Sequence, residues 1–335
     1  MIKLLATVAA LAFALLPSPA GAQAVTLKLA FFASDQTTLF RATVQPFVDA
    51  VNAEGKGLVQ IVVYSGGVLG RDVSQQPEAV LNGTADIAYL VPGYTPDRFP
   101  SNSVVELPGL FNDAREATLV YTRLIARNAL RGYDDFVVLG AYVTEPETIH
   151  GRRPIDSIDD LKGRRIRINN TMETAALEKL GALPVPLELS QVADALSAGN
   201  IDATMLASVP LADFGVKRIA TNHYFLGVSG APIALVMSRK VFEALPQAAR
   251  DLLMKYSGEW TAGRFIEIYT NASAKIVQEL KVDPRRAVVF PSSSDLDRAR
   301  SAFQSVIADW LKTDPGNQEL LLAAENELAA LRAGN

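Results

Sequence analysis

The sequence predicts an α/β protein with two similar lobes joined by a long helix, and three observations support this. Strand and helix patterns alternate through residues 156–206, which favours a parallel sheet because parallel neighbours need crossover helices. A helix–glycine–strand unit occurs twice, as AVLNGTADIAYL around Asp86 and as ALSAGNIDATML around Asp202, although a match this short could arise by chance. Apolar residues recur at helical spacing over about 246–281, a length of about 50 Å that would reach across both lobes.

Residues 1–22 have the pattern of a secretory signal peptide. Lys3 precedes an apolar run over 4–16, and Ala20-Gly21-Ala22 fits an A-x-A cleavage site. A membrane anchor is the less favoured alternative, because the run is short for a bilayer and a cleavage site follows it. The absence of cysteine excludes disulfides and a lipid-modified cysteine. We therefore expect a periplasmic protein without stable membrane insertion.

The composition is typical of an ordered globular protein. The chain has 335 residues, of which 49% are hydrophobic and 20% are charged, and this length allows two sizeable cores. The net charge is −4 and no basic run is present, which argues against nucleic acid and anionic membrane surfaces as partners.

The first lobe is expected to comprise residues 23–144 together with about 232–272. The glycine-rich segment 66–70 is interpreted as a turn, since it lacks a phosphate-binding glycine pattern. The turn-rich segment 92–100 follows a predicted strand, and such loops often carry binding groups. Strands are predicted at Val25–Phe31, Leu58–Tyr64, the end of Glu78–Leu90, Phe136–Val143 and Phe225–Met237, and helices at Thr38–Asn52 and Ala114–Ala129.

The second lobe is expected to comprise residues 145–231 together with about 273–335. Asn170 and Glu173 form a capping box that starts a helix, and Gly181 ends it. For the long helix, the alternative is two consecutive helices broken near Gly258. The other predicted elements are strands at Arg165–Ile168, Val185–Leu187, Ile201–Leu206 and Val288–Phe290, and helices at Ser190–Gly199, Asp295–Lys312 and Gln318–Leu331.

Arg167 is the strongest candidate for a binding residue. It lies near the end of a predicted strand, just before a helix start, where ligands of open α/β sheets and anions are favoured. A guanidinium can hold a carboxylate through two parallel hydrogen bonds. The alternative is a surface arginine on an edge strand, which is the interpretation favoured for Arg164 and Arg165.

The residues that catalysis would need are scarce. The two histidines, His150 and His223, are too few for a typical zinc site without cysteine, and no G-x-S-x-G motif is present. Glu147 and His150 form an E-x-x-H pattern, for which a hydrogen-bonded loop histidine is favoured over a metal ligand or proton relay. We expect no cofactor and no enzyme activity. A secreted α/β hydrolase with a histidine base and an extracytoplasmic sensor module remain as alternatives.

Several segments, taken in order, resemble a known family. SGGVLGRD, NGTADIAYL and ELPGLF precede SIDDLKGRRIRIN, LGALPV and ALSAGNIDA. This set is similar to the solute-binding proteins of TRAP (tripartite ATP-independent periplasmic) transporters and covers nearly the whole predicted mature chain. The resemblance implies a two-lobed periplasmic binding protein fold with a long helix spanning both lobes. It also implies that the protein captures a small organic acid and delivers it to membrane permease subunits.

The resemblance also implies roles for single residues. Arg167 falls on the family's carboxylate-binding arginine, Asn170 on a ligand-contacting position, and Asp72 on a further candidate position. Glu147 replaces the second arginine of sialic-acid-binding members, Leu206 replaces a common asparagine, and Val91 and Tyr94 replace an acid and an arginine. These departures imply a ligand with an apolar or aromatic body. The residues expected to line that body are Phe31, Tyr89, Tyr94, Met205 and Leu206, and Glu147 and His150 complete the set of candidate ligand contacts.

Overall fold

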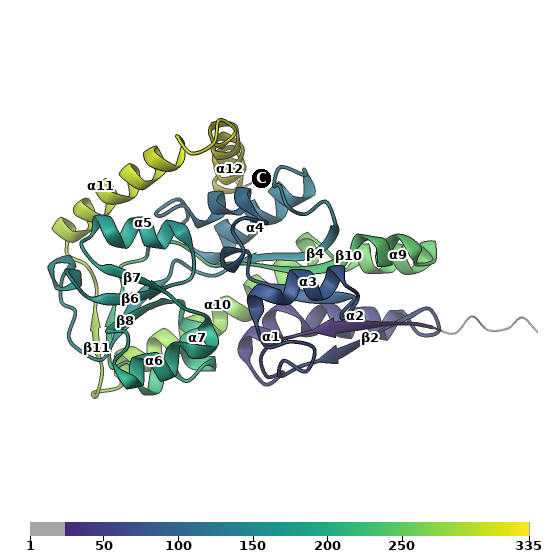
Figure 1. Cartoon of the computed structure of the whole chain (residues 1–335), viewed down its shortest axis with the longest axis horizontal. Coiled ribbons are helices and arrows are strands. Elements are labelled where there is room, and N and C mark those ends of the chain that lie inside the picture. Colours follow the sequence, from purple (N-terminus) through teal and green to yellow (C-terminus); the bar gives the residue numbers. More distant parts are fainter. Residues whose placement is uncertain (1–23, 335) are drawn as a thin grey trace, which may run out of the picture.

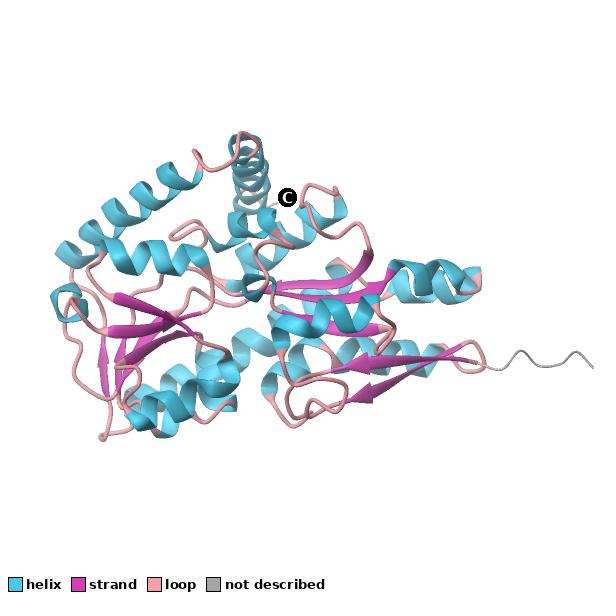
Figure 2. Cartoon of the chain, in the orientation of Figure 1, coloured by secondary structure: helices cyan, strands magenta, loops and turns pink. Residues whose placement is uncertain are grey.

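The chain folds into two α/β lobes, each built around one mixed sheet (Figures 1 and 2). This is a computed structural model, and it describes residues 24–334. The predicted signal peptide lies outside these residues. Within them, no helix combines the length and apolar character needed to cross a membrane. The predicted two-lobed α/β class is confirmed.

The first lobe contains a sheet with the strand order β2-β1-β3-β10-β4. β1 runs parallel to β2 and β3, while β10 runs antiparallel to β3 and β4. The strands span β1 Val25–Ala30, β2 Val59–Tyr64, β3 Ile87–Leu90, β4 Phe136–Val143 and β10 Pro232–Ser238. An inner strand of this sheet, β10, therefore comes from chain that returns from the second lobe.

The second lobe contains a sheet with the order β11-β9-β5-β8-β6-β7. The parallel arrangement predicted for residues 156–206 is confirmed, because β6 pairs in parallel with both β7 and β8. β5 runs antiparallel to β8 and β9, and β11 runs parallel to β9. The strands span β5 Thr148–Gly151, β6 Arg165–Ile168, β7 Leu183–Pro186, β8 Ala203–Leu206, β9 Asn222–Tyr224 and β11 Ala287–Val289.

Helices cover both sheets. The helices between the strands are α1 Thr38–Thr43, α2 Gln45–Glu54, α3 Gln76–Leu81, α4 Ala114–Ala126, α5 Thr171–Lys179, α6 Val192–Ala198 and α7 Ser208–Asp213. Those after β10 are α8 Arg239–Ala244, α9 Gln247–Lys255, α10 Glu259–Val282, α11 Ser293–Trp310 and α12 Asn317–Arg332. Short 3-10 helices are η1 Val73–Gln75, η2 Pro92–Tyr94, η3 Pro100–Glu106, η4 Ile158–Leu161, η5 Leu189–Gln191 and η6 Val216–Arg218.

The repeated unit that suggested two lobes has the same local structure in both. Asp86 follows α3 and accepts a hydrogen bond from the backbone N–H of Lys28 on β1 at 2.7 Å. Asp202 follows α6 and accepts one from the backbone N–H of Arg165 on β6 at 2.9 Å. Each aspartate thus fixes the strand after its helix against the neighbouring parallel strand.

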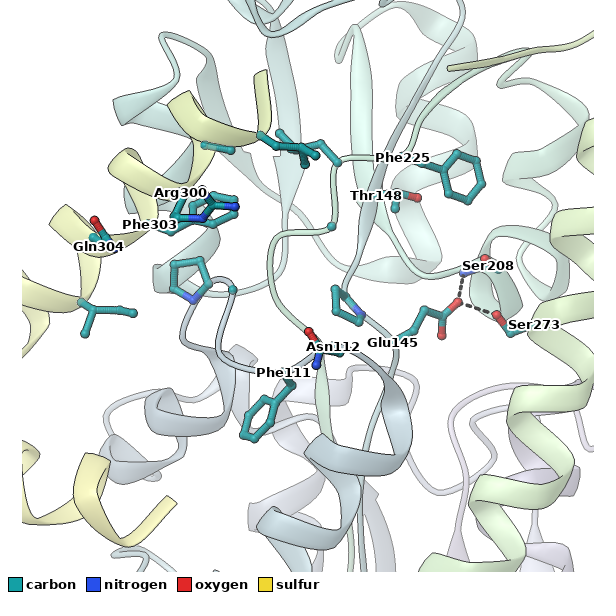
Figure 3. Close-up of a pocket in the computed structure, with 18 of the residues that line it drawn as sticks. Phe111, Asn112, Glu145, Thr148, Ser208, Phe225, Ser273, Arg300, Phe303 and Gln304 are labelled. Carbon is teal, nitrogen blue, oxygen red and sulfur yellow. Dashed lines mark hydrogen bonds between the residues drawn. The ribbon is translucent and has the colours of Figure 1, made fainter. Parts of the chain in front are cut away.

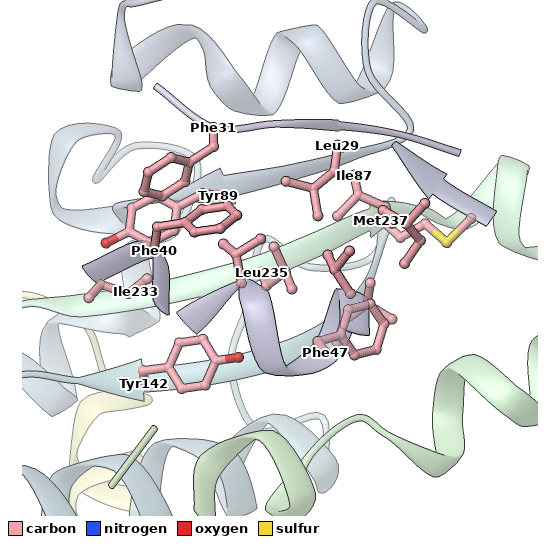
Figure 4. Close-up of a cluster of buried hydrophobic side chains, with 14 of the residues drawn as sticks. Leu29, Phe31, Phe40, Phe47, Ile87, Tyr89, Tyr142, Ile233, Leu235 and Met237 are labelled. Carbon is pink, nitrogen blue, oxygen red and sulfur yellow. The ribbon is translucent and has the colours of Figure 1, made fainter. Parts of the chain in front are cut away.

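Aliphatic and aromatic side chains fill the space between the first sheet and its helices (Figure 4). Leu29, Ile87 and Leu235 project from three adjacent strands onto Phe47 of α2, and all four are fully buried. Each buried side chain of this size contributes about 1.5–3 kcal/mol through removal from water.

Two segments connect the lobes and lie against each other. The segment after β4 pairs with the segment before β10: Glu147 donates its backbone N–H to Ser229 at 2.8 Å, and Thr144 donates to Ala231 at 3.2 Å. A Cβ atom on Gly230 would lie 2.5 Å from the carbonyl oxygen of Thr144, so only glycine allows this approach. The predicted strand Phe225–Met237 is therefore shorter than expected, since its first half forms this connection.

The long helix is also shorter than expected. The single helix predicted over about 246–281 is wrong, because α9 and α10 are separate elements on either side of Gly258, which has φ 60°. α10 packs on α1, α4 and β4 of the first lobe and on α7 and β11 of the second, so it still braces both. Similarly, the helix predicted at Thr38–Asn52 is divided at Val44, since Pro46 supplies no backbone N–H.

The two C-terminal helices pack on different lobes. α11 packs on α5 of the second lobe, to which residues 273–335 were assigned. α12 differs from that expectation: Leu320, Leu321, Ala324, Leu328 and Leu331 join the core formed around α4 of the first lobe. The apolar face of α12 matches this surface, which a local sequence pattern does not reveal.

Candidate functional site

A small cavity lies between the two lobes, where the carboxyl ends of β3 and β6 face each other. Its volume is about 40 Å³. The first lobe contributes Phe32, Leu39, Tyr89, Val91, Tyr94, Ala231 and Ile233; the second contributes Arg167, Asn169, Leu189, Leu206 and Pro210; and Thr144 and Glu147 come from the connection. Most of this lining is apolar, so a charged group here is poorly hydrated.

Arg167 is the buried cation of this cavity. It is 1% exposed, at the end of β6, where Ile166 and Ile168 pack into the core on the opposite face. Its guanidinium donates from Nε to Leu187 O at 2.8 Å, from Nη1 to Met205 O at 3.2 Å and from Nη2 to the Tyr94 hydroxyl at 2.7 Å. These neutral acceptors fix the plane of the guanidinium without neutralising its charge.

Tyr94 connects the lobes at this point. It belongs to η2 of the first lobe, and its hydroxyl accepts hydrogen bonds from Arg167 Nη2 and from the backbone N–H of Leu189 at 3.0 Å, both in the second lobe. Burial raises the pKa of Tyr94 above its usual range, so the hydroxyl keeps its proton. Because both lone pairs are used, that proton is available to a further acceptor.

A network of buried carboxyl groups lies beside Arg167. Asn169 donates from Nδ2 to Glu147 Oε2 at 2.9 Å, and its backbone N–H donates to Glu173 Oε2 at 3.0 Å. Burial, and then the neighbouring Glu173, raise the pKa of Glu147 well above its usual value, while Arg167 opposes the shift. Burial also raises the pKa of Glu173. The pair therefore retains a proton more readily than exposed carboxyls do.

The structure brings half of the predicted site residues to one cavity. Tyr89, Tyr94, Glu147, Arg167 and Leu206 all line it. Met205 contributes only its carbonyl oxygen, which accepts from Arg167, while its side chain lies in the core. Phe31 does not line the cavity; it packs edge-on against Tyr89 at 5.2 Å, and Phe32 takes the lining position.

Asn170 and Asp72 lie outside the cavity. Asn170 lines an adjoining groove of about 440 Å³ that shares Tyr94 and Asn169 with the cavity. The Asn170 side chain caps α5 by accepting from the backbone N–H of Glu173 at 2.8 Å, as predicted. The second bond of the predicted capping box is not formed as expected, because the Glu173 carboxyl accepts from the backbone N–H of Asn169 instead of Asn170. Asp72 caps η1 beside Glu188, and burial together with Asp72 raises the pKa of Glu188 to about 7.

His150 is part of the core of the second sheet. Its Nδ1 lies 2.9 Å from Nδ1 of His223, and its Nε2 lies 3.1 Å from Leu206 O. Burial lowers the pKa of His150 to about 3 and that of His223 to about 4. Among residues 24–334, no group of three or more His, Cys, Asp or Glu side chains is arranged to hold a metal ion.

A larger groove of about 690 Å³ lies at the connection between the lobes (Figure 3). Glu145 points from the connection toward α7 and α10, where Ser208 N and Ser273 Oγ donate to its Oε1 at 2.9 and 2.8 Å. Arg300 in this groove pairs with Asp297 at 2.8 Å. The arginine of this groove is thus already paired, and its buried charge is a carboxylate, Glu145, whose Oε2 has no partner in the described part of the chain. The smaller Arg167 cavity, with its buried cation, is therefore the better candidate for an anionic ligand.

Sequence reasoning missed Phe32, Leu39, Asn169, Leu189 and Ile233. Asn169 is next to Asn170 and two residues after Arg167, both of which were selected. Because side chains alternate along a strand, a residue two positions after Arg167 points to the same side, and this spacing is the signal that could have found Asn169. Leu39, Leu189 and Ile233 are ordinary apolar residues from distant segments, so only the packing of the lobes reveals them.

The comparisons with known proteins define the family. The family model "Bacterial extracellular solute-binding protein, family 7" matches residues 29–314, and the chain belongs to this family of transport proteins. A curated relative, the "Outer membrane transporter protein TsaT" of Comamonas testosteroni, is 26% identical over 311 residues, which cover 89% of each protein. The predicted resemblance to TRAP solute-binding proteins is confirmed.

Solved structures of the family have the same fold. A marine metagenome TRAP solute-binding protein specific for aromatic acid ligands, in complex with metahydroxyphenylacetate, matches with a TM-score of 0.85 and 25% identity, covering 91% of this chain and 99% of that one. A TRAP solute-binding protein from Rhodoferax ferrireducens, with copurified benzoate, matches with a TM-score of 0.84 and 25% identity, covering 91% and 98%.

Proposed function

We propose that this protein is the periplasmic solute-binding subunit of a TRAP transporter, and that it captures a small carboxylic acid with an apolar or aromatic body. One observation carries the proposal: Arg167 places a buried positive charge, held only by neutral acceptors, in a mostly apolar cavity between two lobes. A buried charge without an opposite charge is costly, and a ligand carboxylate would supply it.

The donor count favours a carboxylate in particular. A guanidinium has five N–H groups, and three of those of Arg167 donate to Leu187, Met205 and Tyr94. Two N–H groups on the terminal nitrogens are left, which matches the two oxygens of a carboxylate. The Tyr94 hydroxyl proton can bind one of the same oxygens. Glu147 and Leu206 then contact the ligand body together with Tyr89.

Lobe movement is part of the proposed cycle. A cavity of about 40 Å³ has room for little more than one water molecule, so an organic acid enters only when the lobes separate. Residues from both lobes surround the ligand on closure, which favours the closed state in its presence. The closed protein would then deliver the acid to its membrane permease. Export with removal of residues 1–22 would place it in the periplasm.

The two structural neighbours with 25% identity support an aromatic body, since they were solved in complex with metahydroxyphenylacetate and with copurified benzoate. The lining of this cavity is consistent with such a ring, because Phe32, Leu39, Val91 and Ile233 present apolar surface. We regard aromatic acids as the first class to test.

Arg167→Lys tests the proposal. Lysine keeps the positive charge but lacks the planar fork, so the two parallel bonds to the carboxylate are lost. We expect a loss of roughly 2–5 kcal/mol in binding free energy, measured by isothermal titration with aromatic and aliphatic acids. Thermal unfolding of the unliganded variant checks that the fold is intact, because Arg167 also binds Leu187 O and Met205 O.

Arg165→Ala is the matched control. Arg165 lies on the same strand, but its side chain is exposed and pairs with Asp202 at 3.1 Å. Removing it should leave ligand affinity within about twofold, since exposed ion pairs contribute about 0–1 kcal/mol and this one is remote from the cavity. Equal affinities for wild type and Arg167→Lys would refute the assignment of Arg167 as the carboxylate-binding residue.

A further inference from the structure

Tyr89 is a buried tyrosine in the cavity whose hydroxyl has no partner. Its side chain is 1% exposed, and no hydrogen bond to its hydroxyl is formed by residues 24–334. Among the other buried tyrosines, Tyr142 donates to Thr43 O at 2.9 Å and Tyr224 to Asp295 at 3.1 Å. The Tyr269 hydroxyl also lacks a partner among the described residues, but Tyr269 does not line the cavity. A hydroxyl that loses its water to a bound ligand without gaining a new partner costs about 1–3 kcal/mol.

The position of this hydroxyl is fixed by aromatic packing. The Tyr89 ring lies edge-on to Phe31 at 5.2 Å and 86°, and 5.6 Å from Phe32. Its strand, β3, is held between β1 and β10. Figure 4 shows the hydroxyl at the edge of the core cluster, beyond Phe31 and on the side of Ile233, which also lines the cavity. The hydroxyl therefore cannot turn to another partner without disrupting this packing.

Tyr89 and Arg167 belong to opposite walls of the cavity. Tyr89 comes from the sheet of the first lobe and Arg167 from that of the second. Burial raises the pKa of Tyr89 well above its usual range, so the group is a neutral phenol that can donate one hydrogen bond and accept others. The walls between them are mainly apolar, through Phe32, Leu39 and Leu206.

We propose that the Tyr89 hydroxyl binds a second oxygen of the ligand, so that this site selects carboxylic acids that also carry a hydroxyl or carbonyl group on their apolar body. The inference rests on the proposed function, because it assumes that Arg167 holds the carboxylate. An acid without the second oxygen leaves the Tyr89 hydroxyl unpaired in the closed cavity and binds more weakly. Because the ligand would then contact both lobes, a hydrogen bond to its second oxygen also stabilises the closed state.

The test compares matched acids on wild type and Tyr89→Phe. Titration calorimetry with benzoate and its three hydroxy derivatives, and with phenylacetate and mandelate, measures the preference for the extra oxygen. We expect wild type to bind at least one hydroxy acid about tenfold more tightly than its unsubstituted parent. Tyr89→Phe should abolish this preference, so that the hydroxy acid and its unsubstituted parent bind the variant with affinities within about twofold of each other.

Tyr142→Phe is the control, since it removes a hydroxyl from the same core without altering the cavity. It should lower thermal stability and keep the wild-type preference. The Tyr89 assignment is overturned if wild type shows no preference, or if Tyr89→Phe keeps it, and in both cases acid binding through Arg167 still stands. A wild-type protein that binds none of these acids, or an Arg167→Lys variant that binds all of them normally, would overturn the proposed function itself.

Discussion

Glu106 is a buried acid at the contact between the lobes, close to the carboxyl network beside Arg167. It is 3% exposed, and its Oε1 has no hydrogen-bond partner among the described residues. Burial, and then Glu173, raise the pKa of Glu106 to about 8. Glu106 comes from η3 and Glu173 from α5, so the two carboxyls meet across the lobes. A negative charge on either carboxyl therefore destabilises the contact between the lobes.

Glu106→Gln should change how stability depends on pH. The pKa of Glu106 is raised from 4.5 to about 8 in the folded state. The protonated Glu106 carboxyl therefore contributes its full stability below pH 4.5, and this contribution is lost as the pH rises to about 8. Glutamine cannot ionise, so the variant should gain on the order of a few kcal/mol relative to wild type between pH 5 and pH 8. Urea unfolding at both pH values measures the difference.

Glu116→Gln is the opposite case. Its carboxyl pairs with Arg332 at 2.8 Å, and this hydrogen bond lowers the pKa of Glu116. The contribution of Glu116 is present above its unfolded pKa of 4.5 and is lost only at lower pH. The loss of stability caused by Glu116→Gln should therefore be similar at pH 5 and pH 8. Parallel pH profiles for wild type and Glu106→Gln would contradict the role assigned to Glu106.

Single residues could be predicted from the sequence only where a local pattern constrained them. Arg167 was selected from its place at the end of a strand before a capped helix, and it lines the cavity between the lobes, while its binding role stays a prediction. Phe31 and Phe32 were not distinguished, because β1 ends at Ala30 and the alternation of side chains stops there. The burial of Glu106 and Glu173 was not predicted, since nothing in a local sequence distinguishes a buried glutamate from an exposed one.

The break between α9 and α10 shows how one backbone conformation defines an element boundary. Gly258 has φ 60° and ψ −126°, which disfavours every residue with a side chain, although no atom would obstruct its Cβ. Gly258→Ala should lower the free energy of unfolding by about 1–3 kcal/mol through backbone strain alone. Chemical denaturation measures this change.

Gly263→Ala is a matched control inside α10. Gly263 is exposed in the helix, and a Cβ there would also contact nothing. Alanine should stabilise the protein by about 0.5–1 kcal/mol, because glycine is a poor helix former. If both variants changed stability in the same direction, backbone strain at Gly258 would not explain the break.

Most elements were predictable because hydrophobic period and capping residues act locally. The N-cap of α5 at Asn170 and the bounds of β6 are examples, whereas β7 and β8 begin at other residues than predicted. The long helix is divided because Gly258 adopts a positive φ. The sequence did not reveal this, because the helical spacing of apolar residues continues through Gly258. The docking of α12 on α4 depended on contacts between segments about 200 residues apart, which no local pattern encodes.

The contact between the lobes includes direct bonds away from the cavity. Asp213, at the end of α7 in the second lobe, accepts hydrogen bonds from the backbone N–H groups of Thr38 at 3.1 Å and Leu39 at 2.9 Å, in the first turn of α1. Charge-assisted bonds of this kind favour the arrangement in which the lobes touch. Asp213 does not line the Arg167 cavity, so a substitution at Asp213 alters lobe closure without removing a ligand contact.

Asp213→Ala should shift the unliganded protein toward an open form. The loss of two interlobe bonds lowers the closed population, and ligand affinity falls by the same factor, on the order of tenfold. Small-angle scattering should give a larger radius of gyration, restored by saturating acid. Asp113→Ala removes a similar cap within the first lobe, where Asp113 accepts from Glu116 N at 2.8 Å, and should only lower stability. Identical scattering and affinity for the two variants would exclude Asp213 as a closure contact.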